Sequence, residues 1–147
     1  MIVLLDTDHF SILQRQHGST RSVLQARLAQ VPVGDIKLSI VSFQEQAQGW
    51  LAFIHRARKP EEVLRGFFDL QEMLRHYATF DVLPFDRAAL AELAALKQQR
   101  IRIGTSDLRI AAIAKANGVT LLSRNLRDFR QVPGLDVEDW TAQEESR

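Results

Sequence analysis

The sequence contains no cysteine, and this absence excludes two kinds of stabilising structure. The chain can form neither a disulfide bond nor a zinc site with thiolate ligands. Such a composition suits the reducing cytoplasm, which is the location that we expect for this protein.

Long hydrophobic runs and a strong charge of either sign are also missing. The apolar run at the N-terminus ends at Asp6, which is too early for a signal peptide. No stretch approaches the roughly 20 apolar residues of a membrane-spanning helix, so we expect no membrane association. The net charge of +1 is far from the strongly basic balance of proteins that coat nucleic acids, although an enzyme that contacts nucleic acid briefly remains compatible with it.

The sequence does contain enough apolar residues for one well-packed domain. Of its 147 residues, 46% are hydrophobic and 25% are charged, which is ordinary for a globular protein. No repeat, low-complexity tract or linker divides the chain. We therefore expect a single domain over residues 1–147, with a frayed tail from about residue 141.

Strand and helix patterns alternate along the chain. Strands are expected at 2–5, 37–41, 80–83, 119–122 and 135–137. Helices are expected at 7–16, 19–30, 42–58, 60–77, 87–100 and 104–117, with a short one after Ser123. This alternation predicts an α/β fold with a central, mostly parallel sheet and helices on both faces. Ligands of such folds bind at the carboxyl ends of the strands.

Acidic side chains follow these strand ends or lie at helix starts. Asp6 follows the first strand, and Glu45 and Asp107 lie in the first turns of two helices. Asp128 follows the fourth strand, and Asn125 lies closer to that strand's end. Carboxylates gathered in one crevice repel one another unless a counter-charge is present. Mg²⁺ or Mn²⁺ supplies that charge and can support hydrolysis of a phosphodiester.

Two of these acids also have a purely structural interpretation in the local sequence. Asp6, with Asp8, can cap the helix that starts at Thr7. Ser42 and Glu45 have the spacing of a capping box, in which Glu45 bonds back to the Ser42 amide. A polar residue that ends so apolar a strand is nevertheless a frequent functional position, so we favour a functional role for Asp6.

The other two acids are equally ambiguous when taken singly. Asp107 lies where the helix dipole favours a negative charge, although Thr105 or Ser106 can serve as the cap and leave Asp107 free. Asp128 alone is an ordinary surface acid. Only the joint placement of the acids indicates a site.

Five segments of the sequence together resemble the PIN-domain family, and most closely the VapC toxins of bacterial type II toxin–antitoxin modules. They fall in the family's order and cover nearly the whole chain. The segments are LLDTDH at 4–9, SFQE at 42–45, GTSDLRIAAIA at 104–114, LLSRNLRDF at 121–129 and PGLDVEDW at 133–140.

The resemblance implies an activity and partners. The activity is that of a Mg²⁺- or Mn²⁺-dependent endoribonuclease that cuts structured RNA such as tRNA or rRNA. The expected protein partners are a VapB-type antitoxin and a second copy of the chain in a homodimer.

The resemblance also implies roles for individual residues. Asp6, Glu45 and Asp107 match the three central acids of the family. Asp6 and Asp107 are then the main metal ligands. Glu45 binds the metal directly or through water, or helps to activate the nucleophilic water.

The fourth acidic position departs from the family pattern. Many PIN domains carry an aspartate where this chain has Asn125, which leaves the number of bound metal ions open. Asp128, one helical turn further on, can supply the missing charge and joins the catalytic candidates. Thr7 and Ser123 match small hydroxyl positions that orient carboxylates or bound water.

Basic and aromatic residues support weaker hypotheses. Arg124, Arg127 and Arg130 would flank the site and hold RNA phosphates, or else form an ordinary solvated surface. His9 fits a hydrogen-bonded core or surface position better than a general base. Aromatic residues at helical spacing fit core packing, or a groove or dimer face: Trp50, Phe53, Phe67, Phe68 and Tyr77.

Two alternative functions stay open at this stage. Asp6 and Asp8 have the Asp-x-Asp spacing of haloacid-dehalogenase-like phosphatases, but Phe10 does not match that motif and its other residues are not evident. A non-catalytic PIN-like module that binds RNA or protein is the second alternative. The presence of Asp6, Glu45 and Asp107 argues against it.

Overall fold

The computed structural model describes residues 1–15 and 17–142, and within them five strands form one sheet. The strand order is β3-β2-β1-β4-β5, and all four pairings are parallel. The strands are β1 (Val3–Leu5), β2 (Ile36–Ser39), β3 (Asp81–Leu83), β4 (Thr120–Leu122) and β5 (Val137–Glu138). The expected α/β fold with a parallel sheet is confirmed.

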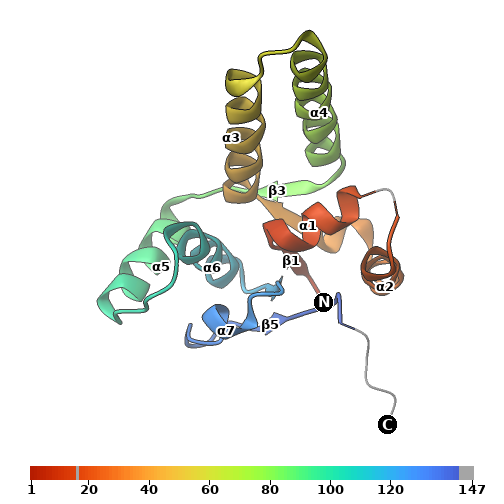
Figure 1. The fold of residues 1–147 in the computed structure, drawn as a ribbon. Coiled ribbons are helices and arrows are strands. Elements are labelled where there is room, and N and C mark those ends of the chain that lie inside the picture. Colours follow the sequence, from red (N-terminus) through yellow and green to blue (C-terminus); the bar gives the residue numbers. More distant parts are fainter. Residues whose placement is uncertain (16, 143–147) are drawn as a thin grey trace.

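Helices cover both faces of this sheet, as the alternating pattern predicts. In Figure 1, α1 and α2 lie on one side, and α5, α6 and α7 lie on the other. The long helices α3 and α4 pack side by side and project as an arm away from the sheet. The helices are α1 (Thr7–Gln14), α2 (Ser19–Leu28), α3 (Ile40–Arg56), α4 (Pro60–Thr79), α5 (Arg87–Gln98), α6 (Thr105–Asn117) and α7 (Leu126–Phe129), with a 3₁₀ turn at Val33–Asp35.

The central strand β1 joins two hydrophobic cores. Its three residues are completely buried, and successive side chains of a strand point to opposite faces of the sheet. Leu4 packs with the apolar residues of α5 and α6, whereas Val3 and Leu5 pack with those of α1, α2 and α4. The position of Asp6, which follows directly, is therefore fixed by packing on both faces.

The start of α3 differs from the sequence prediction. The helix begins at Ile40, and Ser39 is its N-cap, with its hydroxyl accepting a hydrogen bond from the Ser42 N–H at 3.0 Å. Ser42 is thus a buried residue inside the helix, so the predicted capping box of Ser42 and Glu45 is wrong. The carboxylate of Glu45 is consequently not engaged in capping and can serve another purpose.

The N-caps of the next two helices on the other side of the sheet differ. Asp86 caps α5, accepting a hydrogen bond from the Ala89 N–H at 3.0 Å. Helix α6 instead has Gly104 as its N-cap, with no side-chain cap bond, so the prediction of a cap at Thr105 or Ser106 is wrong.

The remaining element ends differ from the prediction by only a few residues, except at two boundaries. The expected helix end at Gln16 lies outside the described residues, and α1 ends at Gln14. Thr141, where we expect the tail to fray, is instead buried, and its N–H and hydroxyl both donate to Asp139. Residues 143–147 lie outside the described part. None of the described helices has the length and hydropathy of a membrane span.

The arm of α3 and α4 depends on a glycine at its contact. A Cβ at Gly66 would lie 2.6 Å from Ile54 Cγ1 and 3.1 Å from Phe53 Cδ1. We predict that Gly66→Ala lowers the free energy of unfolding by about 1–3 kcal/mol, because Ile54 is β-branched and cannot easily move aside. Urea denaturation followed by circular dichroism measures the change.

Gly49→Ala is the matched control, because Gly49 lies in α3 with open space where its Cβ would be. It should raise stability slightly, since alanine favours helix more than glycine does. Equal effects of the two substitutions would contradict the close helix contact at Gly66.

Candidate active site

Asp6 lies at the carboxyl end of β1 and is buried. Its Oδ1 accepts a hydrogen bond from the Thr7 N–H at 2.8 Å, so it does cap α1. Its Oδ2 accepts a hydrogen bond from the hydroxyl of Ser123, at the end of the neighbouring strand β4, at 2.7 Å. Asp6 therefore has both the structural role and the predicted position in a polar cluster at the strand ends.

The surroundings of Asp6 favour its protonated form. Its pKa is raised to about 7, mainly by burial and also by the charge of Asp8 and, more weakly, that of Asp107. The hydrogen bonds from Ser123 and Thr7 lower the pKa but do not offset these effects. A carboxylate at this position is thus destabilised by its surroundings, and in the described part of the chain no lysine or arginine pairs with it.

Glu45 is held beside Asp6 by Thr7. The Thr7 hydroxyl donates a hydrogen bond to Glu45 Oε1 at 2.9 Å and lies 2.9 Å from the Ser42 hydroxyl. The start of α3 at Ile40 places Glu45 in the second turn of the helix, from which it reaches α1. Thr7 thus has the orienting contact that the resemblance implies.

Asn125 connects the other two acids. Its side-chain amide donates to Asp107 Oδ2 at 3.2 Å and to Asp128 Oδ2 at 3.0 Å. The pKa of Asp107 is raised, first by burial and then by the charge of Glu45, whereas the Asn125 hydrogen bond lowers it. Asp6, Glu45 and Asp128 thus each lie close enough to Asp107 for their charges to interact, with Asn125 as the donor between Asp107 and Asp128.

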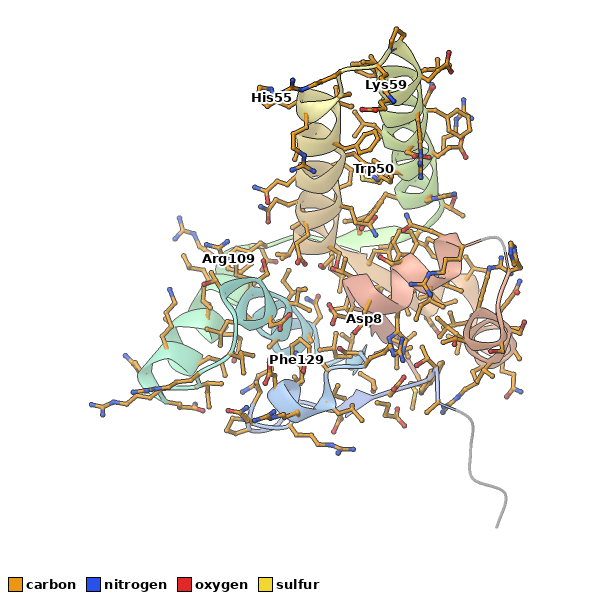
Figure 2. The ribbon with its side chains drawn as sticks, viewed as in Figure 1. Asp8, Trp50, His55, Lys59, Arg109 and Phe129 are labelled. Carbon is orange, nitrogen blue, oxygen red and sulfur yellow. The ribbon has the colours of Figure 1, made fainter. Side chains whose placement is uncertain are left out.

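Asp8 belongs to the same network, although the sequence prediction did not include it among the site residues. Its Oδ2 accepts from the Arg124 N–H at 3.0 Å and from the Ser123 hydroxyl at 3.3 Å, and its Oδ1 lies 2.8 Å from His9 Nδ1. Figure 2 shows Asp8 in the middle of the molecule, between α1 and the layer that contains α6. The sequence feature that could have indicated Asp8 is its position two residues after Asp6, the acid that follows β1.

The network lowers the pKa of Asp8. Burial alone would raise it, but the hydrogen bonds from His9 and from the Arg124 N–H outweigh burial. His9 itself is completely buried, which confirms the expected core role and excludes direct contact with a substrate.

The three arginines lie on the outside of this region. Arg124, Arg127 and Arg130 are all exposed, and among the described residues none of them forms an ion pair. Only the backbone of Arg124 enters the acidic network, through its bond to Asp8.

The chemistry of the cluster fits a hard divalent cation. Its donors are carboxylate, amide and hydroxyl oxygens, and over residues 1–15 and 17–142 no lysine or arginine pairs with Asp6, Glu45, Asp107 or Asp128. The ligand geometry is not preformed, because in the same residues no three acids or histidines are already arranged to hold an ion.

The burial of Asp6 has a consequence for the metal-free protein. Its pKa is about 7 in the folded state and 3.8 ordinarily, so between these values the folded protein binds a proton that the unfolded chain has released. The stability contributed by this group is therefore present below about pH 4 and is lost as the pH rises through 7. We predict that Asp6→Asn raises the free energy of unfolding at pH 8 by an amount on the order of 1–3 kcal/mol, and by much less at pH 5.

Urea denaturation in EDTA at both pH values measures this effect. The control is Glu61→Gln on the exposed surface of α4, which should behave like the wild type at both. A destabilised Asp6→Asn variant at pH 8 would show that the charge of Asp6 is favourable, contrary to its surroundings.

Comparison with known proteins agrees with the fold. The model of the family described as PIN domain matches residues 3–135. Ribonuclease VapC2 of Haemophilus influenzae is 34% identical over 85 residues, which are 57% of this chain and 64% of that protein. The tRNA(fMet)-specific endonuclease VapC of Shigella flexneri is 28% identical over 74% of this chain and 77% of its own. The chain thus spans somewhat less than two thirds of the length of the first of these relatives.

Solved structures show the same fold at low sequence identity. A structure of FitAB bound to an IR36 DNA fragment has a TM-score of 0.73 at 24% identity, covering 99% of this chain and 100% of that one. VapBC-1 from nontypeable Haemophilus influenzae has a TM-score of 0.71 at 21% identity, covering 97% of this chain and 100% of that one.

The phosphatase alternative can now be set aside. Both oxygens of Asp8 are already occupied by hydrogen bonds, so Asp8 is not available as the second acid of an Asp-x-Asp motif. The family model, in contrast, extends over β1, β4 and all four acids that the structure gathers. This chain belongs to the PIN domain family.

Proposed function

We propose that this chain is a Mg²⁺- or Mn²⁺-dependent endoribonuclease that acts as the toxin of a type II toxin–antitoxin module. The observation that carries the proposal is the cluster of Asp6, Glu45 and Asp107, whose oxygens have no cationic partner among the described residues. The relatives' names, Ribonuclease VapC2 and tRNA(fMet)-specific endonuclease VapC, support RNA as the substrate.

The proposed metal ligands are Asp6, Asp107 and Glu45. A bound divalent cation supplies a counter-charge to these acids and the means to activate water against a phosphodiester. The Thr7 hydroxyl orients the carboxylate of Glu45. The Ser123 hydroxyl binds Asp6 Oδ2 and thereby fixes the orientation of the whole Asp6 carboxylate. The chain's own part is thus to hold three carboxylates close together at a cost in stability.

Asn125 and Asp128 have a supporting role in this proposal. The amide of Asn125 donates to both Asp107 and Asp128, so it holds these two carboxylates near each other without adding charge. Asp128 supplies the fourth negative charge in place of the aspartate that many PIN domains carry at position 125. We propose Arg124, Arg127 and Arg130, which are exposed beside this loop, as contacts for RNA phosphates.

The proposed protein partners are a VapB-type antitoxin and a second copy of the chain. Structural neighbours include VapBC and FitAB complexes and a toxin–antitoxin complex from Klebsiella pneumoniae with a TM-score of 0.67. A groove between α1 and the arm is lined by Trp50 and Phe53 and by the basic side chains of Arg15, Arg56 and Arg65, of which Arg65 pairs with Asp69. This lining suits an acidic amphipathic segment. Large apolar side chains are also exposed on α3 and α4, at Leu51, Leu64, Phe67, Phe68 and Leu74.

The decisive test is cleavage of total bacterial RNA by the purified protein. We predict discrete fragments with Mg²⁺ or Mn²⁺ and none in EDTA. Asp6→Asn and Asp107→Asn should each lower the rate by about 100-fold or more, because even residues that only support metal ligands are worth roughly 10–100-fold. Gel electrophoresis with end mapping measures the rate and identifies the RNA that is cut.

Asp35→Asn serves as the control, since Asp35 lies in the 3₁₀ turn outside the cluster. It should cleave RNA at the wild-type rate. Absence of cleavage by folded, antitoxin-free wild-type protein in either metal would favour the non-catalytic PIN-like module.

The role of Asn125 has its own test. Asn125→Asp removes the donor between Asp107 and Asp128 and adds a third negative charge. We predict a lower Tm without metal and a larger rise in Tm on addition of MnCl₂ than in the wild type, because the added repulsion is relieved only by the cation. Differential scanning fluorimetry measures both.

Gln71→Glu makes the same chemical change on the exposed surface of α4 and should leave the Mn²⁺ response unchanged. An Asn125→Asp variant with a Tm rise equal to that of the wild type would show that position 125 does not contribute to metal binding.

A further inference from the structure

An unbroken series of hydrogen bonds connects the acidic cluster to the C-terminal part of the fold through His9. The Trp140 N–H donates to His9 Nε2 at 3.1 Å, and His9 Nδ1 lies 2.8 Å from Asp8 Oδ1. The other oxygen of Asp8 accepts from the Arg124 N–H. The single hydroxyl hydrogen of Ser123 lies between two acids, with its oxygen 2.7 Å from Asp6 Oδ2 and 3.3 Å from Asp8 Oδ2. The imidazole is completely buried, so each of its nitrogens depends on the protein for a partner.

The geometry determines which nitrogen of His9 carries the proton. A backbone N–H points at Nε2, and this nitrogen can accept that bond only if it bears no hydrogen. The hydrogen is then on Nδ1, which donates to Asp8. Asp139 Oδ1 is also near, at 3.6 Å from Nε2, but it already accepts two hydrogen bonds from Thr141.

Asp8 acts on the loop between β4 and α7. Its bonds to the Arg124 N–H and the Ser123 hydroxyl lie directly beside Asn125, whose N–H donates to Ser123 Oγ at 3.0 Å. This loop carries the groups that hold Asp6, Asp107 and Asp128. The orientation of Asp8 therefore affects acids that it does not itself contact.

The other side of His9 is anchored in the fold. Trp140 is buried, and the guanidinium of Arg27 in α2 lies 4.7 Å from the centroid of its ring. This cation–π contact and the two bonds between Thr141 and Asp139 fix the segment that presents the Trp140 N–H.

We propose that His9 is a positioning residue of the nuclease site. Its Nδ1–H orients Asp8 and, through Asp8, the loop of Ser123 and Asn125. Its Nε2 accepts the hydrogen bond that holds the segment around Trp140 in place. The effect of His9 on catalysis rests on the proposed function of the chain as a ribonuclease. The two nitrogens have separate tasks: Nδ1 serves the site, and Nε2 serves the stability of the fold.

Two substitutions separate these tasks. The side-chain amide of asparagine reaches the place of Nδ1, so His9→Asn keeps a donor to Asp8 and loses the acceptor for Trp140. Glutamine reaches the place of Nε2, so His9→Gln keeps the acceptor and loses the donor. We predict that His9→Asn has the lower Tm but a kcat for RNA close to that of the wild type. His9→Gln should have the higher Tm of the two, a kcat lowered about tenfold and an unchanged KM.

Coupling to Asp8 provides a second measurement. If His9 acts through Asp8, the double variant Asp8→Asn with His9→Gln should have the same kcat as Asp8→Asn alone. His17→Asn, at an exposed histidine, is the control for loss of an imidazole. A kcat that follows Tm in both His9 variants, or multiplicative losses in the double variant, would overturn the proposal.

Nuclear magnetic resonance tests the geometry without RNA. Long-range ¹H–¹⁵N spectra of the metal-free wild type should show His9 as the Nδ1–H tautomer. The amide signal of Arg124, which the Asp8 bond determines, should move in His9→Gln and stay nearly constant in His9→Asn. If the wild type cleaves no RNA, the proposed function fails, but these spectra still test whether His9 positions Asp8. A His9 that carries its hydrogen on Nε2 overturns the positioning role.

Discussion

The structure depends on a carboxylate placed at the end of its most deeply buried strand. Removing the charge of Asp6 from water is costly, and neither a lysine nor an arginine compensates it among the described residues. The position cannot relax, because β1 is packed on both faces and paired on both edges. The neighbouring elements instead accommodate the charge with hydrogen bonds from Thr7 and Ser123.

The groups that donate hydrogen bonds to these acids are nearly all neutral, and their neutrality has a chemical consequence. Hydroxyl and amide donors such as those of Ser123 and Asn125 fix the direction of a carboxylate but leave most of its negative charge in place. An arginine in the same position would satisfy the geometry and also neutralise the site, so that a metal ion would gain little by binding. The pKa values of Asp6 and Asp107 are raised first by burial and then by the neighbouring carboxylates, and the neutral donors do not offset these effects.

Sequence reasoning located the acids because their signal is local: an apolar strand followed at once by an acid, in a chain whose alternation implies a parallel sheet. It misplaced the start of α3 because Ser39 and Ser42 are both suitable caps and the apolar Ile40 and Val41 continue the strand pattern. It left Asp8 out of the site, because two of the residues that bond to it, Ser123 and Arg124, are more than 110 positions away in the chain. Contacts of such separation are products of the folded topology and leave no trace in a local pattern.

The strand order also determines when the cluster can exist. Among the described strands β1 comes first in the chain but lies in the middle of the sheet, and its partner β4 and the loop that bears Asn125 follow more than 110 residues later. During translation, therefore, Asp6 has no Ser123 and Asp107 has no Asn125 as a hydrogen-bond donor until that loop has emerged. The acidic cluster therefore assembles only after β4 and the loop of Asn125 have left the ribosome, so a nascent chain that ends before them has no complete site.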